Sequence, residues 1–257
     1  MKYILIIGDG MADDPLEELG GRTPLEVCSK PYFDSLSERG TLGLVQTIPE
    51  GFPPGSDPAI MSIFGCDPAK YFSGRAPLEL AASGGVMPEG GACYRCNMVT
   101  LGGDESLPFA EKTMVSHSAG SIEGEESDEL IEWLFGHEEF KPMAEAAGMS
   151  VRPGSSFRHL AVQENGDIAG IVLAPPHDHL GEQIGGILPA GNANAKTLLA
   201  LMEKANALLE HHPINEKRRA EGHLPANGIW FWAEGKGARL PNFTEHYGAT
   251  GGVVSAV

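Results

Sequence analysis

The sequence predicts an α/β fold, in which a core built on a parallel sheet carries an inserted α+β lobe. Three observations lead to this prediction. An apolar run at residues 3–10 ends abruptly on glycine, which is typical of a parallel strand buried on both faces. A helical pattern and a second apolar run follow it and complete a β-α-β unit. Residues 80–225 then change in character, with strands separated by long polar loops.

Length and charge limit the class of protein. The 257 residues are enough to bury a sizeable core, and 42% of them are hydrophobic. The net charge of -17 argues against a nucleic-acid or anionic-membrane surface, although a pocket for a small anionic substrate needs only a few arginines. No apolar run reaches the roughly 18 residues of a membrane span, and the N-terminus lacks a signal-peptide pattern. We therefore expect a cytoplasmic protein.

The elements of the expected core follow in order. We expect strands at 3–8 and 41–48, both apolar and β-branched. Between them, Pro31 marks the start of a helix, because proline is tolerated in a first turn, and Gly40 is its C-cap. Residues 58–72 read as a short helix and a turn.

Three segments organise the chain. Residues 1–79 form the first part of the core, 80–225 the inserted lobe, and 226–257 the return to the core. Within the lobe, apolar runs predict strands at 93–101, 157–163 and 167–174, and helical periodicity predicts helices at 126–137 and 194–212. After it we expect core strands at 227–236 and 251–257, with a helix at 240–248.

The sequence stops within an apolar run. Chain termini usually lie at the surface, so a buried strand is an unusual place to finish. Either this strand lies at the edge of a sheet, or the sequence is part of a longer protein. We expect the second.

The cysteines do not predict a disulfide framework or a metal site. Cys93 and Cys96 form a C-x-x-C motif, but it lies inside a predicted strand, and no second pair completes a tetrahedral zinc site. A structural role is therefore expected for both.

Asp9 is a candidate metal ligand. It follows the first predicted strand and lies between two glycines, and ligands of α/β sheets bind at the carboxyl ends of the strands. A carboxylate there suits a hard divalent cation. A turn aspartate or a helix N-cap is the alternative.

Ser56 is a candidate nucleophile. Two prolines and Gly55 lead into a tight turn, which places Ser56 near a helix N-terminus, where backbone amides and the helix dipole favour an anion. A serine hydroxyl is a poor nucleophile unless a base or a metal activates it, and a metal shared with Asp9 would do so. We expect the two side chains to lie close together at one sheet edge. A simple N-cap is the alternative.

Several blocks together resemble a known family. They occur in the order "IIGDGMAD", "PLEELGGRTPLE", "PEGFPPGSDPAIMSIFGCDP", "YFSGRAPLELA", "YRCNMVT", "SHSAG", "PGSSFRHL" and "ANGIWFWAEGKGARLPNF". The set is similar to the archaeal-type 2,3-bisphosphoglycerate-independent phosphoglycerate mutases, which include a bacterial branch also labelled a proposed homoserine kinase. The resemblance implies an alkaline-phosphatase-like α/β core with a metal site, and an inserted lobe that clamps the substrate.

The resemblance also implies roles for single residues. Asp9 would bind a divalent metal (Mn, Mg or Zn). Ser56 would be both a metal ligand and the nucleophile, passing through a phosphoserine as 3-phosphoglycerate and 2-phosphoglycerate interconvert without 2,3-bisphosphoglycerate.

Substrate contacts are expected from the inserted lobe. Arg75 is the first candidate, because a guanidinium fork suits both phosphate and carboxylate. Arg95, Arg158 and His159 are further candidates. His117 would act in binding or proton transfer, although relatives often have an aromatic residue there. The H-x-H of "PPHDHLG" lacks a third nearby ligand, so we interpret it as a loop motif.

The pattern departs from the family in one respect. Relatives continue into Asp and His blocks that complete a two-metal site, and those blocks are not present in this sequence, so we expect this chain to be inactive by itself. Two alternatives remain: a homoserine-kinase-like phosphotransferase, for which no P-loop is seen, and a non-catalytic binding module. The expected partners are a small phosphorylated substrate and a second copy of the chain, without nucleic acid or membrane.

Overall fold

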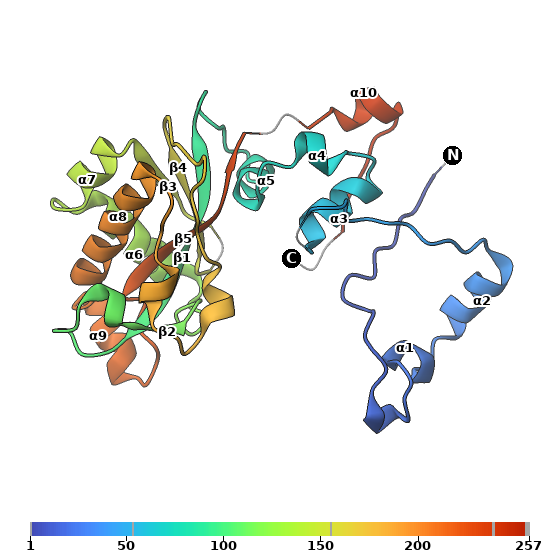
Figure 1. Ribbon diagram of the computed structural model, residues 1–257, viewed down its shortest axis with the longest axis horizontal. Coiled ribbons are helices and arrows are strands. Elements are labelled where there is room, and N and C mark those ends of the chain that lie inside the picture. The colour runs from blue at the N-terminus through green and yellow to red at the C-terminus, as the bar shows by residue number, and fades with distance from the viewer. Residues whose placement is uncertain (1, 53, 155, 238–239, 255–257) are drawn as a thin grey trace. The chain divides into compact units, whose positions relative to one another are not determined.

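The computed structural model describes residues 2–52, 54–154, 156–237 and 240–254. The chain divides into two compact units, Met1–Lys70 and Tyr71–Val257, which are treated separately here (Figure 1). This boundary differs from the expected division at 79/80 and 225/226. No described helix has both the length and the apolar character needed to cross a bilayer.

Short helices make up the regular structure of the first unit. They are η1 (Glu17–Leu19), α1 (Pro24–Val27), α2 (Pro31–Arg39), α3 (Ser56–Ile63) and α4 (Pro68–Tyr71), the last of which extends to the boundary. The prediction for α2 is confirmed, because this helix begins at Pro31 and has Gly40 as its C-cap. Thr23 and Glu26 form a capping box that fixes the start of α1.

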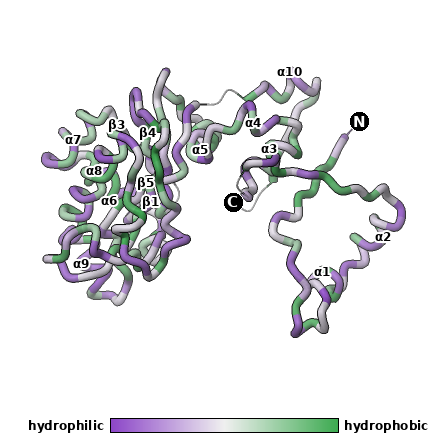
Figure 2. Tube along the Cα trace, in the orientation of Figure 1, coloured by the Kyte–Doolittle hydropathy of each residue, from purple (hydrophilic) through white to green (hydrophobic). Residues whose placement is uncertain are grey.

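The expected parallel strands of the first unit are not formed. Residues 3–8 and 41–48 contain no strand, and their apolar side chains are exposed, with Ile4 at 88%. Both segments include hydrophobic stretches in Figure 2. An apolar strand needs neighbours that pair its backbone groups and layers that cover its side chains, and the described residues of this unit provide neither. The parallel-sheet prediction is therefore wrong for this structure.

The second unit is built on a five-stranded sheet. Its strands are β1 (Ala92–Gly102), β2 (Thr113–Ser116), β3 (Met149–Arg152), β4 (Arg158–Gln163) and β5 (Gly228–Lys236). The order is β2-β1-β4-β3, and β5 pairs with β1. Every pairing is antiparallel. The strand predicted at 227–236 is present as β5. It was expected to return to a parallel core, but it pairs antiparallel with β1, so that part of the prediction is wrong.

Helices cover both faces of this sheet. The helices of this unit are α5 (Arg75–Ala82), α6 (Gly124–Gly136), α7 (Lys141–Ala146), α8 (Ala193–Leu209), α9 (Pro213–Ala220) and α10 (Phe243–Tyr247), with short turns η2 (Phe109–Glu111), η3 (Pro176–His179) and η4 (Ile184–Ile187). Residues of α6, α7 and α8 share the main apolar core with β1 and β5 (Figure 1). The predicted helices at 126–137, 194–212 and 240–248 are confirmed in α6, α8 and α10.

Two predicted strands of this unit are absent. Residues 167–174 form only an isolated bridge, Val172 to Ala190. Residues 251–254 are not a strand, and residues 255–257 lie outside the described part of the chain.

Side chains of β1 alternate between two environments. Tyr94, Cys96 and Met98 belong to the main core, whereas Cys93 packs with Leu80 of α5 in a second cluster on the opposite face. Cys93 and Cys96 therefore point away from each other and cannot share a disulfide or a metal. Burial, followed by the charge of Glu79, raises the pKa of the Cys93 thiol to about 12, which keeps it protonated. The expected structural role of the C-x-x-C is confirmed.

His159 lies on the core side of β4. Its Nδ1 accepts the N–H of Gly154 at 3.2 Å, and its Nε2 lies 3.0 Å from Ser127 Oγ, so the neutral ring donates from Nε2 to the hydroxyl. The residue is only 1% exposed. Burial lowers its pKa to about 4, because a charged ring would lose its hydration.

This buried histidine predicts acid sensitivity. The unfolded chain takes up a proton near pH 6.5 and the folded chain only near pH 4, so stability is full above pH 6.5 and falls as the pH drops towards 4. The loss due to His159 amounts to about 3 kcal/mol. We expect His159→Gln to remove this part of the pH dependence. The measurement is urea denaturation followed by tryptophan fluorescence, since all 3 tryptophans lie in the second unit.

His211→Gln serves as the matched control, because the His211 side chain is 65% exposed. It should keep the pH dependence of the unchanged protein. Equal acid sensitivity of the His159→Gln and unchanged proteins would contradict the prediction.

Candidate functional site

Asp9 and Ser56 are in direct contact within the first unit. The Ser56 hydroxyl donates a hydrogen bond of 2.9 Å to Asp9 Oδ2, across 47 residues of chain. The expected proximity is confirmed. The expected setting is not, because no described strand precedes either residue in this unit.

The start of α3 directs the serine hydroxyl. Gly55 is the N-cap in extended backbone, and Ser56 is the first helical residue. Its hydroxyl donates to Asp9, and the N-cap position belongs to Gly55, so the N-cap alternative does not describe Ser56. The first amides of a helix have no acceptor within the helix, and the amide of Ala59 donates to Gly55 O at 3.4 Å. The hydroxyl thus lies beside a helix N-terminus and a carboxylate.

These two side chains fit part of a site for a hard divalent cation. A carboxylate and a serine oxygen are donors that such ions accept. Catalytic sites usually have three or more protein ligands, and no group of three His, Cys, Asp or Glu side chains with metal-site geometry occurs among the described residues. The pair is therefore an incomplete ligand set.

Charged residues gather on the α5 side of the sheet in the second unit. Glu79 of α5 accepts the Nε–H of Arg75 on Oε1 and the Nε–H of Arg95 on Oε2, each at 2.9 Å. Arg95 is 6% exposed, and burial lowers its pKa, whereas the hydrogen bond that it donates to Glu79 opposes this shift. Within the described part of the chain, the terminal nitrogens of Arg95 make no hydrogen bond and remain available to a ligand.

Aromatic rings hold the cations in place. The Arg95 guanidinium lies 4.8 Å from the centre of the Trp232 ring, and the Arg158 guanidinium lies 4.2 Å from the centre of Phe157. Trp232 is fixed in turn by the hydrogen bond of 3.0 Å from its Nε1 to Asn97 Oδ1. Stacking of this kind stabilises a guanidinium without using its hydrogen-bond donors.

Two histidines join these rings. His177 lies 5.1 Å from Trp232 and 6.0 Å from His117, and His117 lies 5.7 Å from Phe157, all as ring centroids. Burial lowers the pKa of His117, and the nearby charges of His177 and Arg158 lower it further. We refer to Arg75, Arg95, His117, Arg158 and His177, together with the Trp232 ring, as the cationic face.

The structure brings together most, but not all, of the predicted substrate residues. Arg75, Arg95, Arg158 and His117 belong to the cationic face. His159 does not, because neighbouring residues of a strand point to opposite faces of the sheet, which places it in the core beside Ser127. Adjacent residues of a strand alternate between its two faces, so the sequence could have predicted that Arg158 and His159 do not share a site.

Sequence reasoning missed three members of this arrangement. Glu79 bridges two arginines, Trp232 lies under one of them, and His177 comes from the H-x-H motif interpreted as a loop. Of that motif, His179 pairs with Glu182 at 2.8 Å, and His177 contacts Trp232. No pattern of spacing joins these positions, since they lie on α5, β5 and η3.

Comparison with known proteins places these features in a family. The profile of the 2,3-bisphosphoglycerate-independent phosphoglycerate mutase family matches residues 37–215. The chain is 42% identical over 260 residues to a probable 2,3-bisphosphoglycerate-independent phosphoglycerate mutase of Geobacter sulfurreducens, and 44% identical over 259 residues to the enzyme of that name from Methanosarcina acetivorans. Each alignment covers 100% of this chain and 61% of the relative.

A solved structure is also similar. The PH0037 protein of Pyrococcus horikoshii matches with a TM-score of 0.62 and 29% identity, over 93% of this chain and 53% of that one. The chain spans 61% of the length of the two curated relatives named above. Because the family profile matches residues 37–215, the chain belongs to the 2,3-bisphosphoglycerate-independent phosphoglycerate mutase family.

Proposed function

We propose that this chain carries the nucleophile and the substrate-binding lobe of an enzyme that interconverts 3-phosphoglycerate and 2-phosphoglycerate. The observation that carries the proposal is the 2.9 Å hydrogen bond between Ser56 Oγ and Asp9 Oδ2. Family membership supports the reaction, and the names of the relatives support independence from 2,3-bisphosphoglycerate.

Ser56 is the proposed phosphoryl acceptor. Its oxygen attacks the phosphorus of 3-phosphoglycerate, the bond between phosphorus and the 3-oxygen breaks, and the serine proton leaves towards Asp9 Oδ2. The released 3-oxygen takes up a proton to give glycerate. After glycerate reorients, its 2-hydroxyl loses a proton and attacks the phosphorus of the phosphoserine, the bond between phosphorus and Ser56 Oγ breaks, and that oxygen takes up a proton to regenerate the serine.

The charge around Ser56 requires a cation for this chemistry. Asp9 lies against the hydroxyl, and its carboxylate disfavours an approaching phosphoryl anion. A divalent ion (Mn, Mg or Zn) held by Asp9 and Ser56 would supply the positive charge that stabilises the serine oxygen and the transferring group. The amides at the start of α3 add to that stabilisation.

The cationic face is the proposed binding surface for the anionic ends of the substrate. The protein carries 35 acidic and 18 basic residues, so a cluster of basic side chains on one face is opposite in sign to the net charge. Arginine forks match carboxylate and phosphate oxygens. Arg95 and Arg158 are already held by Trp232 and Phe157, so less side-chain entropy is lost when they bind an anion.

Further ligands are required to complete the metal site. The described residues supply a carboxylate and a hydroxyl, whereas the curated relatives are longer than this chain, which covers 61% of their length. We propose that the missing ligands come from residues outside this sequence. Mutase turnover by residues 1–257 alone, with Mn, Mg or Zn added, would contradict this part of the proposal.

The first prediction concerns the nucleophile. In an active protein that contains this chain, we expect Ser56→Ala to abolish turnover of 3-phosphoglycerate while lowering stability by about 1 kcal/mol or less. Mass spectrometry after an acid quench should detect phosphoserine in the unchanged protein and not in the variant. Ser62→Ala is the matched control, because Ser62 lies in the same helix and its hydroxyl donates to Pro58 O. Retained turnover in Ser56→Ala would exclude this residue as the nucleophile.

The second prediction concerns the cationic face. Removing the charge of Arg158 deletes charge-assisted hydrogen bonds worth about 1.5–3 kcal/mol, so Arg158→Gln should raise KM for 3-phosphoglycerate roughly tenfold or more. Steady-state kinetics on the same active protein measures this. Arg152→Gln is the control, since Arg152 lies on the neighbouring strand β3 and donates to Ser83 O. An unchanged KM in Arg158→Gln would remove Arg158 from the binding surface.

A further inference from the structure

Two close backbone contacts set the position of α5 against β5. Gly74 is the N-cap of α5 with φ 120°, and a Cβ on this residue would overlap Glu234 O. A Cβ on Gly235 would likewise overlap Ser73 O. Only glycine fits where two backbones approach this closely. The start of α5 is therefore fixed on the sheet, and with it the position of Glu79 one turn further along the helix.

Glu79 uses both of its carboxylate oxygens on arginines. Oε1 accepts the Nε–H of Arg75 and Oε2 accepts the Nε–H of Arg95, each at 2.9 Å. A guanidinium has a second donor edge, formed by its two terminal nitrogens, and that edge matches two oxygens of a carboxylate or a phosphate. The contact between Arg95 and Glu79 does not use the terminal edge of Arg95.

Trp232 confines Arg95 on another side. The Arg95 guanidinium lies 4.8 Å from the centre of the Trp232 ring. Asn97 fixes this ring, because its Oδ1 accepts the Trp232 Nε1–H at 3.0 Å, while its Nδ2 donates to His117 O at 2.9 Å. Asn97 is 1% exposed and Arg95 is 6% exposed. The Arg95 side chain is thus held on its Nε edge and on one face of its guanidinium.

Glu79 also offsets the repulsion between the arginines. Burial lowers the pKa of Arg95, and the positive charges of Arg75 and Arg158 lower it further, whereas the hydrogen bond to Glu79 and the charge of Glu79 raise it. Three cations outnumber this one carboxylate, so the cluster keeps a positive charge for an anionic ligand. Without Glu79, Arg95 would keep the repulsion of two like charges and lose its ion pair, and we expect its side chain to turn towards solvent.

We propose that Glu79 is a positioning residue for substrate binding, an inference that rests on the proposed mutase function. Glu79 holds the Nε edge of Arg95 and Trp232 covers its face, so the terminal edge is presented to a carboxylate or phosphate group of 3-phosphoglycerate. Because the arginine is ordered before the ligand arrives, less side-chain entropy is lost on binding. The Glu79 carboxylate therefore promotes the binding of a ligand that has the same sign of charge.

Charge alone predicts the opposite effect. A carboxylate near a bound anion repels it, so its removal would tighten binding. The Glu79 side chain is 33% exposed, and solvent weakens this repulsion. Loss of positioning affects two arginines, and each side chain that must be ordered on binding costs roughly twofold to tenfold in affinity. Positioning therefore outweighs repulsion, and the sign of the change separates the two effects.

Glu79→Gln tests the proposal in an active protein that contains this chain. Glutamine has nearly the same shape, but its amide nitrogen cannot accept an N–H, so its two ends no longer accept one arginine each. We expect KM for 3-phosphoglycerate to rise about fivefold or more, with kcat changed less than about twofold, because the lost interaction contributes to binding in the ground state and the transition state alike.

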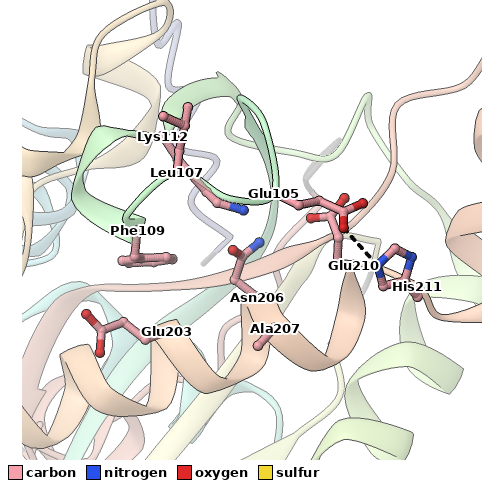
Figure 3. A pocket seen from close by; sticks show the side chains of 9 residues that line it. All are labelled: Glu105, Leu107, Phe109, Lys112, Glu203, Asn206, Ala207, Glu210 and His211. Atoms are coloured by element: carbon pink, nitrogen blue, oxygen red, sulfur yellow. Dashed lines mark hydrogen bonds and ion pairs between the residues drawn. The ribbon is translucent and has the colours of Figure 1, made fainter.

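Glu203→Gln is the matched control, because it removes the same charge from an exposed residue of α8. Glu203 lines a separate polar pocket (Figure 3). Residues of α8 pack in the main core, whereas α5 packs in the cluster on the opposite face of the sheet. We expect this variant to keep the KM and kcat of the unchanged protein.

A double-variant cycle connects the effect to Arg95. If Glu79 acts through Arg95, the KM increase of Glu79→Gln/Arg95→Gln is smaller than the product of the increases in the two single variants. A merely structural role of Glu79 would give the product.

Three results would overturn the proposal: a KM that is lowered or unchanged in Glu79→Gln, an equal rise in Glu203→Gln, or a double variant that matches the product. Near-ultraviolet circular dichroism checks the folding of each variant. If Glu79→Gln does not fold, Glu79→Asp decides, since it keeps the charge but shortens the side chain, and an unchanged KM would then overturn the proposal.

The two levels of the proposal fail in different ways. Turnover by the unchanged protein tests the mutase function, whereas the ratio of variant to unchanged protein tests Glu79. If the unchanged protein does not turn over 3-phosphoglycerate, calorimetric titration with 3-phosphoglycerate gives Kd for the same comparison. Absence of saturable binding to the unchanged protein would overturn the role of Glu79 as well.

Discussion

The antiparallel pairing of β1 with its neighbours is the constraint on which the second unit depends. This strand pairs with β2, β4 and β5, so the direction of each side chain on it is fixed by the ladder. Cys96 and Met98 point into the core, whereas Arg95 and Asn97 point to the opposite face, where the same register places Arg158 and Trp232. A shift of one residue would exchange the two sets and turn the charged side chains towards the apolar core. The gathering of cations on one face is thus a consequence of strand register.

The first unit depends on a different kind of interaction. Here the contact between Ser56 and Asp9 links α3 to a segment whose apolar side chains remain exposed. A single hydrogen bond of this type contributes only about 0.5–1.5 kcal/mol, which is far less than the burial of strands such as 3–8 and 41–48 would supply. The proposed catalytic pair therefore lies in the part of the chain with the smallest apolar core, and the second unit, with its closed core of aromatic and aliphatic residues, has the larger share of the buried contacts.

Charge is distributed in a way that serves the proposed substrate. A protein with a net charge of -17 repels anions in general, and the cationic face of the second unit reverses that tendency locally. There, Glu79 and the aromatic rings hold Arg95 and Arg158 in position for an anion.

The sequence by itself determined the local elements and the identity of the central pair. Pro31 and Gly40 delimit α2, helical periodicity identifies α6 and α8, and the glycines and proline around Asp9 and Ser56 mark both as special. Only the tertiary structure decided what depends on contacts between distant segments. The apolar runs at 3–8 and 41–48 carry the pattern of strands but become strands only where neighbours pair with them. The sequence predicted His159 as a ligand, but its strand face places it in the core, and the roles of His177 and Trp232 follow only from neighbours far away in the chain. Local propensity is encoded over a few residues, whereas partners for charge, pairing and burial are set by the fold.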